Sequence, residues 1–223
     1  MSERTSPVVR ERSARAGAPG EGAAARLRIV NLHSRLAGPF DLELAPGECL
    51  AITGPSGSGK SLSLRMVADL DPNEGEVFLD GVERRTLPAP AWRRKVVYSA
   101  AEPGWWHEQV ADHFHGDALE FARTMAPRLA LAPGLLDAPV VQLSTGERQR
   151  MALIRALALH PPVLLLDEAT GALDEDSTAL VEVVLRERLA AGVTIAMVTH
   201  SVAQAARLGH RHLRMENRRL APA

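Results

Sequence analysis

Glycines, a lysine and a serine stand at fixed spacing in residues 54–61, where they form the pattern of a phosphate-binding loop. The segment reads Gly54-Pro55-Ser56-Gly57-Ser58-Gly59-Lys60-Ser61. It fits G-x-x-x-x-G-K-[ST], in which glycines let backbone N–H groups turn toward phosphate oxygens and the following helix adds its positive end. Lys60 would neutralise the β- and γ-phosphates, and the Ser61 hydroxyl would bind Mg²⁺. Because an apolar run precedes the segment and an amphipathic stretch follows it, we prefer this interpretation to a chance Gly/Ser-rich turn.

A second candidate site follows the apolar run at residues 163–166, which ends in Asp167 and Glu168. The run predicts a central strand that delivers both carboxylates to the edge of the sheet where ligands of open α/β sheets bind. Asp167 would hold Mg²⁺, directly or through water, and Glu168 would polarise an attacking water as the general base. The alternative is a surface acidic pair at a strand end, which the phosphate loop makes less attractive.

A third segment, residues 143–150, begins Leu-Ser-Thr-Gly-Glu. Ser144 with Glu147 three residues later is a helix-capping pattern. The segment also resembles the signature of the ABC transporter ATPases, usually written L-S-G-G-Q, in which Ser144 and Gly146 match. The resemblance implies that Ser144, Thr145, Gly146 and Glu147 contact the γ-phosphate of ATP held by an opposing subunit. Thr145 and Glu147 replace the usual Gly and Gln, so Glu147 adds negative charge near phosphate unless it points away or pairs with a neighbouring arginine.

Two further segments resemble the same family and occur in its order. Residues 171–174 look like the D-loop, which crosses the dimer interface and ends here at Asp174. His200 follows the apolar strand at 193–198 and stands at the position of the switch histidine. In the family this histidine contacts the γ-phosphate and orients the catalytic water. The resemblance covers about residues 27–216.

The resemblance implies a function as well as a fold. We expect an ATP-binding and ATP-hydrolysing subunit that uses Mg²⁺, pairs head to tail as a homodimer and energises a separate transmembrane permease. Glu168, His200 and Lys60 would be its catalytic residues. The subunit would be cytoplasmic, and the permease would hold it at the cytoplasmic face of the inner membrane. Residues 68–75 and 144–147 resemble a bacterial subgroup linked to iron or metal export.

Two positions depart from the family pattern. Ala101 stands where the Q-loop glutamine is expected, and Glu102 is a candidate substitute. No aromatic residue stands upstream of the phosphate loop where the family stacks adenine. Arg35 is a candidate planar cation for that role, which leaves ATP and GTP both open.

Adjacent tryptophans and nearby histidines are unusual in a chain with 4% aromatic residues. Trp105 and Trp106 are equally consistent with contact to a permease helix and with core packing. His107, His113 and His115 raise the possibility of a zinc site, which their irregular spacing and the lack of a nearby cysteine disfavour.

Composition excludes some functions. A net charge of −1 gives no indication of a nucleic-acid partner. Cys49 is the single cysteine, so no intrachain disulfide can form, and we expect it to be buried. No stretch reaches the roughly 20 apolar residues of a membrane span, and no signal-peptide pattern is evident.

Turn-forming glycine and proline residues divide the chain into alternating strands and helices, and this alternation predicts an α/β fold. We expect a disordered tail over residues 1–25 and an ABC-type P-loop NTPase domain over 26–223, with a β-rich N-terminal portion and an inserted helical subdomain at about 105–150. Strands are expected at 27–30, 40–44, 49–53, 76–79, 95–99, 163–166 and 193–198. Helices are expected at 60–69, after Ser144, at 177–190 and after Ser201.

Two other functions remain open at this point. A non-transport ABC ATPase acting on nucleic acid or ribosomes usually carries two cassettes or long inserts, which do not fit in 223 residues. A small-molecule P-loop kinase would not need the segment at Ser144 or His200.

Overall fold

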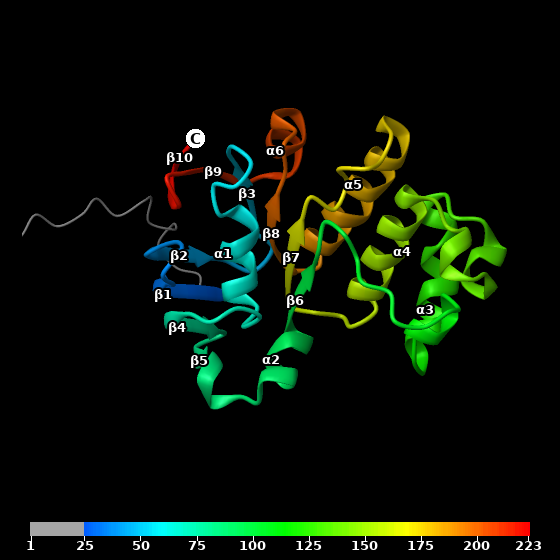
Figure 1. The fold of residues 1–223 in the computed structure, drawn as a ribbon, viewed down its shortest axis with the longest axis horizontal. Helices are drawn as coiled ribbons and strands as arrows, with labels where there is room; N and C mark the ends of the chain where they lie inside the picture. Colours follow the sequence, from blue (N-terminus) through cyan, green and yellow to red (C-terminus); the bar gives the residue numbers. More distant parts are fainter. Residues whose placement is uncertain (1–24) are drawn as a thin grey trace, which may run out of the picture.

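The computed structural model describes residues 25–223, so the predicted tail at 1–25 lies outside the described residues except for Ala25. Two sheets form the centre of the molecule (Figure 1). The larger has the order β10-β9-β3-β8-β7-β6, in which neighbours are parallel except for the antiparallel pair β9 and β10. Its strands are β3 (Cys49–Thr53), β6 (Val96–Ser99), β7 (Val163–Asp167), β8 (Thr194–Val198), β9 (Arg211–Glu216) and β10 (Arg219–Pro222).

The smaller sheet is antiparallel and comes from the N-terminal part of the described chain. Its order is β2-β1-β4-β5. The strands are β1 (Leu27–His33), β2 (Phe40–Leu44), β4 (Glu74–Leu79) and β5 (Val82–Glu83). This is the β-rich N-terminal portion that the sequence predicts.

Two apolar cores lie on opposite faces of the larger sheet, because successive side chains of a strand point to opposite faces. On β7, Leu164 and Leu166 pack into the first core with the helices α3 (Asp117–Met125), α4 (Thr145–Leu157), α5 (Glu175–Ala190) and α6 (Val202–Leu208). Val163 and Leu165 pack into the second core, with α1 (Lys60–Val67), the antiparallel sheet and Trp92 of α2 (Ala89–Lys95). All five residues of β7 are buried, as expected for a strand covered on both faces.

The segment between β6 and α4 is less regularly helical than expected. It holds α3 and four short 3₁₀ helices, at Ala111–His113, Pro127–Leu129, Pro133–Asp137 and Val140–Gln142. Two of these turns begin with a proline, a position that tolerates proline because the first N–H groups of a helix have no partner within it. The helix predicted after Ser144 is α4, which runs to Leu157.

The helix α2 and the strands β5, β9 and β10 were missed in the sequence. Helix α2 is short and begins beside two prolines, and β9 and β10 lie at the edge of the larger sheet. Their hairpin turns at Asn217 and Arg218, which adopt positive φ angles of 47° and 63°. Because no glycine marks this turn, the sequence carries only a weak hairpin signal there. Among residues 25–223, no helix is long and apolar enough to cross a bilayer.

Candidate nucleotide site

The phosphate loop connects β3 to α1, and α1 begins at Lys60 (Figure 1). Gly54, Gly57 and Gly59 have φ angles of 144°, 73° and 105°, a region that residues with a Cβ rarely adopt. At Gly54 a Cβ would also lie 2.4 Å from the backbone oxygen of Met215 on β9. The glycines are therefore required by backbone geometry as well as by access to phosphate.

Lys60 is buried in this loop, although it is a lysine. It is 5% exposed, and its Nζ donates hydrogen bonds to the backbone oxygens of Gly54 and Pro55, both at 2.9 Å. The loop thus holds the ammonium group close to the N-terminus of α1, where an anion binds favourably.

Ser61 and Asp167 come together across 106 residues of sequence. The Ser61 hydroxyl donates to Oδ1 of Asp167 at 3.0 Å, and Asp167 is 3% exposed at the end of β7. Hydroxyl and carboxylate oxygens are the donors that Mg²⁺ prefers. The residues present therefore fit the magnesium site predicted from the sequence.

Tyr98 is a residue of this site that the sequence analysis did not single out. Its hydroxyl, on neighbouring strand β6, donates to Oδ2 of Asp167 at 2.8 Å. Burial, together with the hydrogen bond to Asp167, raises the pKa of Tyr98 far above its usual value. Tyr98 thus orients the carboxylate, and only the pairing of β6 with β7 reveals it.

Glu168 and His200 face each other beyond the strand ends. Nε2 of His200 lies 2.7 Å from Oε1 of Glu168, so the structure brings together the two side chains predicted to act on water. Glu168 adopts a positive φ of 51°, a conformation that costs energy in a residue with a Cβ. Its N–H donates to the backbone oxygen of Val198, the last residue of β8, two residues before His200.

Gln149 of α4 supports the same turn and was also not predicted. It is buried, its Nε2 donates to the backbone oxygen of Glu168 at 2.8 Å, and its Oε1 accepts from the N–H of Ala172 at 3.2 Å. Helix α4, which starts at the signature segment, therefore holds the backbone at Glu168 and at Ala172, on either side of Thr170.

A cavity of about 460 Å³ joins several predicted residues. It is lined by Leu36, Ser56, Gly57, Gly59, Lys60, Ser61, Leu62, Glu168 and Arg218. Leu36 and Arg218 flank the phosphate loop, whereas Arg35, the predicted stacking residue, is not among the lining residues. The neighbours available to a base are thus an exposed leucine and an arginine on the β9–β10 turn.

The signature segment lies outside this cavity and forms the start of α4. Ser144 Oγ accepts from the N–H of Glu147 at 3.2 Å, and the Glu147 carboxylate accepts from the N–H of Ser144 at 2.8 Å. This capping box lowers the pKa of Glu147 through the hydrogen bonds from Ser144. Glu147 therefore bonds to Ser144 rather than to either of the neighbouring arginines. Arg148 donates to Thr145 instead, and Arg150 donates to Ser177.

Asp174 begins α5. Its Oδ1 accepts from the N–H of Ser177 at 2.7 Å, and this backbone hydrogen bond lowers the pKa of Asp174. Close by, a Cβ at Gly146 would lie 3.3 Å from Leu173 and 3.4 Å from the oxygen of Ala172. The signature segment and the D-loop segment thus pack against each other within one chain.

The tryptophan and histidine cluster is organised around His113, which is buried. Its Nε2 accepts hydrogen bonds from the N–H groups of Trp106 and His107 at 3.0 and 3.1 Å, and its Nδ1 donates to the oxygen of Gln109. Burial lowers the pKa of His113. Both ring nitrogens are already used by the backbone, and residues 25–223 contain no group of three or more His, Cys, Asp or Glu residues that could hold a metal ion.

Trp105 and Trp106 behave differently from each other. Trp105 packs partly against the first core, whereas Trp106 is 63% exposed. The Arg155 guanidinium lies over both rings, at 4.7 and 4.6 Å from their centres. The core-packing alternative fits Trp105, and Trp106 remains available for contact.

Comparison with known proteins agrees with this arrangement. The family described as ABC transporter matches residues 38–171. The chain is 39% identical over 214 residues to Protein STAR1 of Oryza sativa subsp. japonica, a match covering 86% of this chain and 62% of that protein. It is 40% identical over 199 residues to the sulfate/thiosulfate import ATP-binding protein CysA of Caulobacter vibrioides, covering 81% and 57%.

A third relative is the probable iron export ATP-binding protein FetA of Escherichia coli, 36% identical over 172 residues and covering 72% of this chain and 76% of that protein. The chain thus spans about 60% of the length of the first two relatives. Among solved structures, a bacterial Atm1-family ABC exporter with ATP bound superposes with a TM-score of 0.74 at 25% identity, over 92% of this chain and 40% of that one.

These likenesses confirm the predicted fold class, a P-loop α/β fold with an antiparallel β subdomain. The matched residues include the phosphate loop, the signature segment and the two carboxylates after β7. The chain therefore belongs to the ABC transporter family.

Proposed function

We propose that this chain is the ATP-binding and ATP-hydrolysing subunit of an ABC transporter. The observation that carries the proposal is that Glu168 lines the same cavity as Lys60 and Ser61, although it lies far from them in the sequence. Glu168 in turn lies within hydrogen-bonding distance of His200. A phosphate-binding loop and a carboxylate–histidine pair on one cavity are the groups needed for phosphoryl transfer to water.

Each group has a role that follows from its position. Lys60 stabilises the charge on the transferring phosphoryl group, Glu168 accepts a proton from the attacking water, and His200 orients that water. Mg²⁺ held by Ser61 and Asp167 would neutralise phosphate charge. Tyr98 keeps the Asp167 carboxylate in place by donating to its second oxygen.

We propose further that two copies pair head to tail and bind ATP between them. Support comes from the signature segment, because residues 144–147 do not line the cavity of their own chain. The N-terminus of α4 would complete the site of a second copy. Asp174 would lie at the same interface.

The test is the substitution Glu168→Gln, which removes the base and keeps the shape. ATP binding should persist, turnover should fall by about 100-fold or more, and size-exclusion chromatography with ATP and Mg²⁺ should show a stable dimer. A variant that hydrolyses ATP at the rate of the unaltered protein would remove Glu168 from the mechanism.

The permease would dock at the groove beside Trp106. A cavity of about 330 Å³ there is lined mainly by apolar and basic side chains, including Leu70, Arg93, Trp106, Arg155 and Leu159. Leu70, Trp106 and Leu159 are exposed apolar residues, a composition typical of a protein interface. The groove also contains residues 97–100, which lead directly to Ala101 in the Q-loop segment.

Trp106→Ala tests this docking site. The variant should hydrolyse ATP normally when purified, and it should no longer co-purify from detergent-solubilised membranes with the permease that the unaltered chain captures. Normal assembly of this variant would show that Trp106 is not part of the interface.

The permease, rather than this chain, would select the transported substrate. Relatives of similar identity are named for import of sulfate and for probable export of iron, so the likeness does not select a metal-export subgroup. Identification of the captured permease would decide the direction and the substrate. A peripheral, cytoplasmic location follows from the proposed docking.

A further inference from the structure

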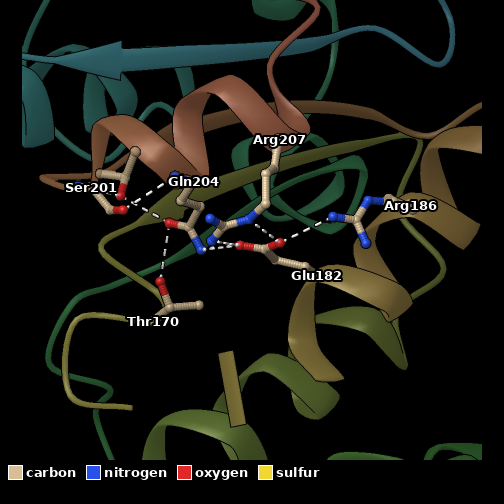
Figure 2. Close-up of polar contacts among 7 residues, drawn as sticks. Thr170, Glu182, Arg186, Ser201, Gln204 and Arg207 are labelled. Atoms are coloured by element: carbon tan, nitrogen blue, oxygen red, sulfur yellow. Dashed lines mark hydrogen bonds and ion pairs between the residues drawn. The ribbon is translucent and has the colours of Figure 1, made fainter. Parts of the chain in front are cut away.

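A glutamate on α5 is buried beneath α6 and held by two arginines (Figure 2). Glu182 is 2% exposed. Arg207 donates to both of its carboxylate oxygens, at 2.9 and 2.7 Å, and Arg186 donates to one of them at 3.0 Å. Burial acts to raise the pKa of Glu182, but the hydrogen bonds and charges of the arginines outweigh it and hold the pKa below the usual value. The carboxylate is therefore ionised at neutral pH and can only accept hydrogen bonds.

This carboxylate fixes the orientation of the Gln204 side chain on α6. Gln204 is also 2% exposed, and its Nε2 lies 3.5 Å from Oε1 of Glu182. Because an ionised carboxylate has no proton to donate, the NH₂ group must face Glu182 and the amide oxygen must face away from it. The amide oxygen then accepts hydrogen bonds from the hydroxyls of Thr170 at 3.1 Å and Thr199 at 2.8 Å.

The two threonines belong to the two loops that carry the reacting side chains. Thr170 comes two residues after Glu168, and Thr199 comes directly before His200. Thr199 Oγ1 also accepts from the N–H of Ser201, so it holds the backbone on both sides of His200. A single amide oxygen thus joins the Glu168 loop to the His200 loop, and Figure 2 shows this oxygen between Thr170 and the start of α6.

We propose that Gln204 is a positioning residue that fixes His200 relative to Glu168, and that Glu182 acts through Gln204 by setting the direction of its amide. This inference rests on the proposed ATPase function and adds a network that lies outside the cavity at the phosphate loop. Its physical basis is the steep dependence of rate on geometry, since a displacement of about 1 Å at a reacting group can cost 100-fold in rate. The distance that this network would hold constant is the 2.7 Å between His200 Nε2 and Glu168 Oε1.

The first test is Gln204→Leu, which keeps a similar volume and removes both polar ends of the side chain. We expect kcat for ATP hydrolysis to fall at least about tenfold while the dissociation constant for ATP changes less than about twofold. Binding is preserved because neither Gln204 nor its partners Thr170, Thr199 and Glu182 line the cavity at the phosphate loop. An unchanged kcat in this variant would overturn the proposal.

A matched control separates positioning from loss of stability. Val184 is buried in the first core on the same helix as Glu182 and does not belong to the polar network. Val184→Ala should lower the thermal midpoint by creating a cavity and should leave the kcat of the folded protein unchanged. If both variants lose kcat in proportion to their loss of stability, Gln204 has only a structural role.

A second, milder pair of variants decides the matter even if Gln204→Leu does not fold. Thr199→Ser keeps the hydroxyl and should retain nearly full kcat, whereas Thr199→Val keeps the shape, loses the hydrogen bond and should reduce kcat with the ATP dissociation constant preserved. Combined with Gln204→Leu, Thr199→Val should cost less than the sum of the two single losses, because both remove the hydrogen bond between Thr199 and Gln204. Equal activity of the Ser and Val variants would refute the inference. An unaltered chain with no ATPase activity would instead refute the proposed function.

Discussion

The hydrogen bond between Tyr98 and Asp167 joins two neighbouring strands and can be tested in isolation. Tyr98 is the only tyrosine in the sequence, so any tyrosine signal comes from this residue. The Tyr98 hydroxyl donates to a carboxylate that is 3% exposed, at 2.8 Å. A hydrogen bond to a charged group contributes about 1.5–3 kcal/mol. Tyr98→Phe removes this donor and leaves the buried Asp167 oxygen with one partner fewer.

We therefore expect Tyr98→Phe to lower the free energy of unfolding by about 1.5–3 kcal/mol. For a domain of this size the thermal midpoint should fall by roughly 3–12 °C. Urea denaturation followed by circular dichroism at pH 8 measures the change. A loss below about 0.5 kcal/mol would show that the hydrogen bond contributes nothing beyond an ordinary surface contact.

The same contact predicts a titration that ultraviolet absorbance can follow directly. Burial and Asp167 raise the pKa of Tyr98 in the folded protein above its unfolded value near 10. The associated stability is fully present below pH 10 and is lost as the pH rises through the folded pKa. Tyrosinate absorbance at 295 nm should therefore stay absent at pH 10–11 while circular dichroism shows a folded chain. Ionisation near pH 10 in the folded protein would refute the reasoning.

Three further predictions concern Gly54, Cys49 and Glu182. Gly54→Ala should abolish ATP binding or folding. The added Cβ would lie 2.4 Å from the Met215 oxygen, and the alanine would have to adopt a φ of 144°. Equilibrium dialysis with nucleotide measures the affinity, and a normal affinity would contradict this prediction. Cys49 is 1% exposed, and burial raises its pKa to about 12, so iodoacetamide at pH 8 should label it only in urea; labelling of the folded chain at the rate of free cysteine would show the thiol to be accessible. The Arg207 contacts lower the pKa of Glu182 despite its burial, so their stabilisation is present above about pH 4.5 and is lost as the pH falls through the folded pKa. Glu182→Gln should flatten the dependence of stability on pH in that acidic range, as urea titrations from pH 3 to 6 would show.

Local patterns in the sequence were enough to predict the chemistry of the site and the order of its parts along the chain. Residues 54–61 require a strand before them and a helix after them, because the motif works only at such a junction. The apolar run before Asp167 likewise identifies a strand buried on both faces. Short-range patterns of this kind depend on neighbouring residues, so they can be recognised without a fold.

Tertiary structure alone decided which distant residues support that chemistry. Tyr98 reaches Asp167 only because β6 pairs with β7, and the sequence offers no pattern that links residues 69 positions apart. Gln204 is polar and unremarkable in the sequence, yet it becomes a bridge once α6 packs over Glu182. The C-terminal hairpin was missed for a related reason, since Asn217 and Arg218 adopt left-handed conformations that a glycine usually marks. Contacts between elements depend on strand order and helix packing, and these are set by burial of the whole chain rather than by any local run of residues.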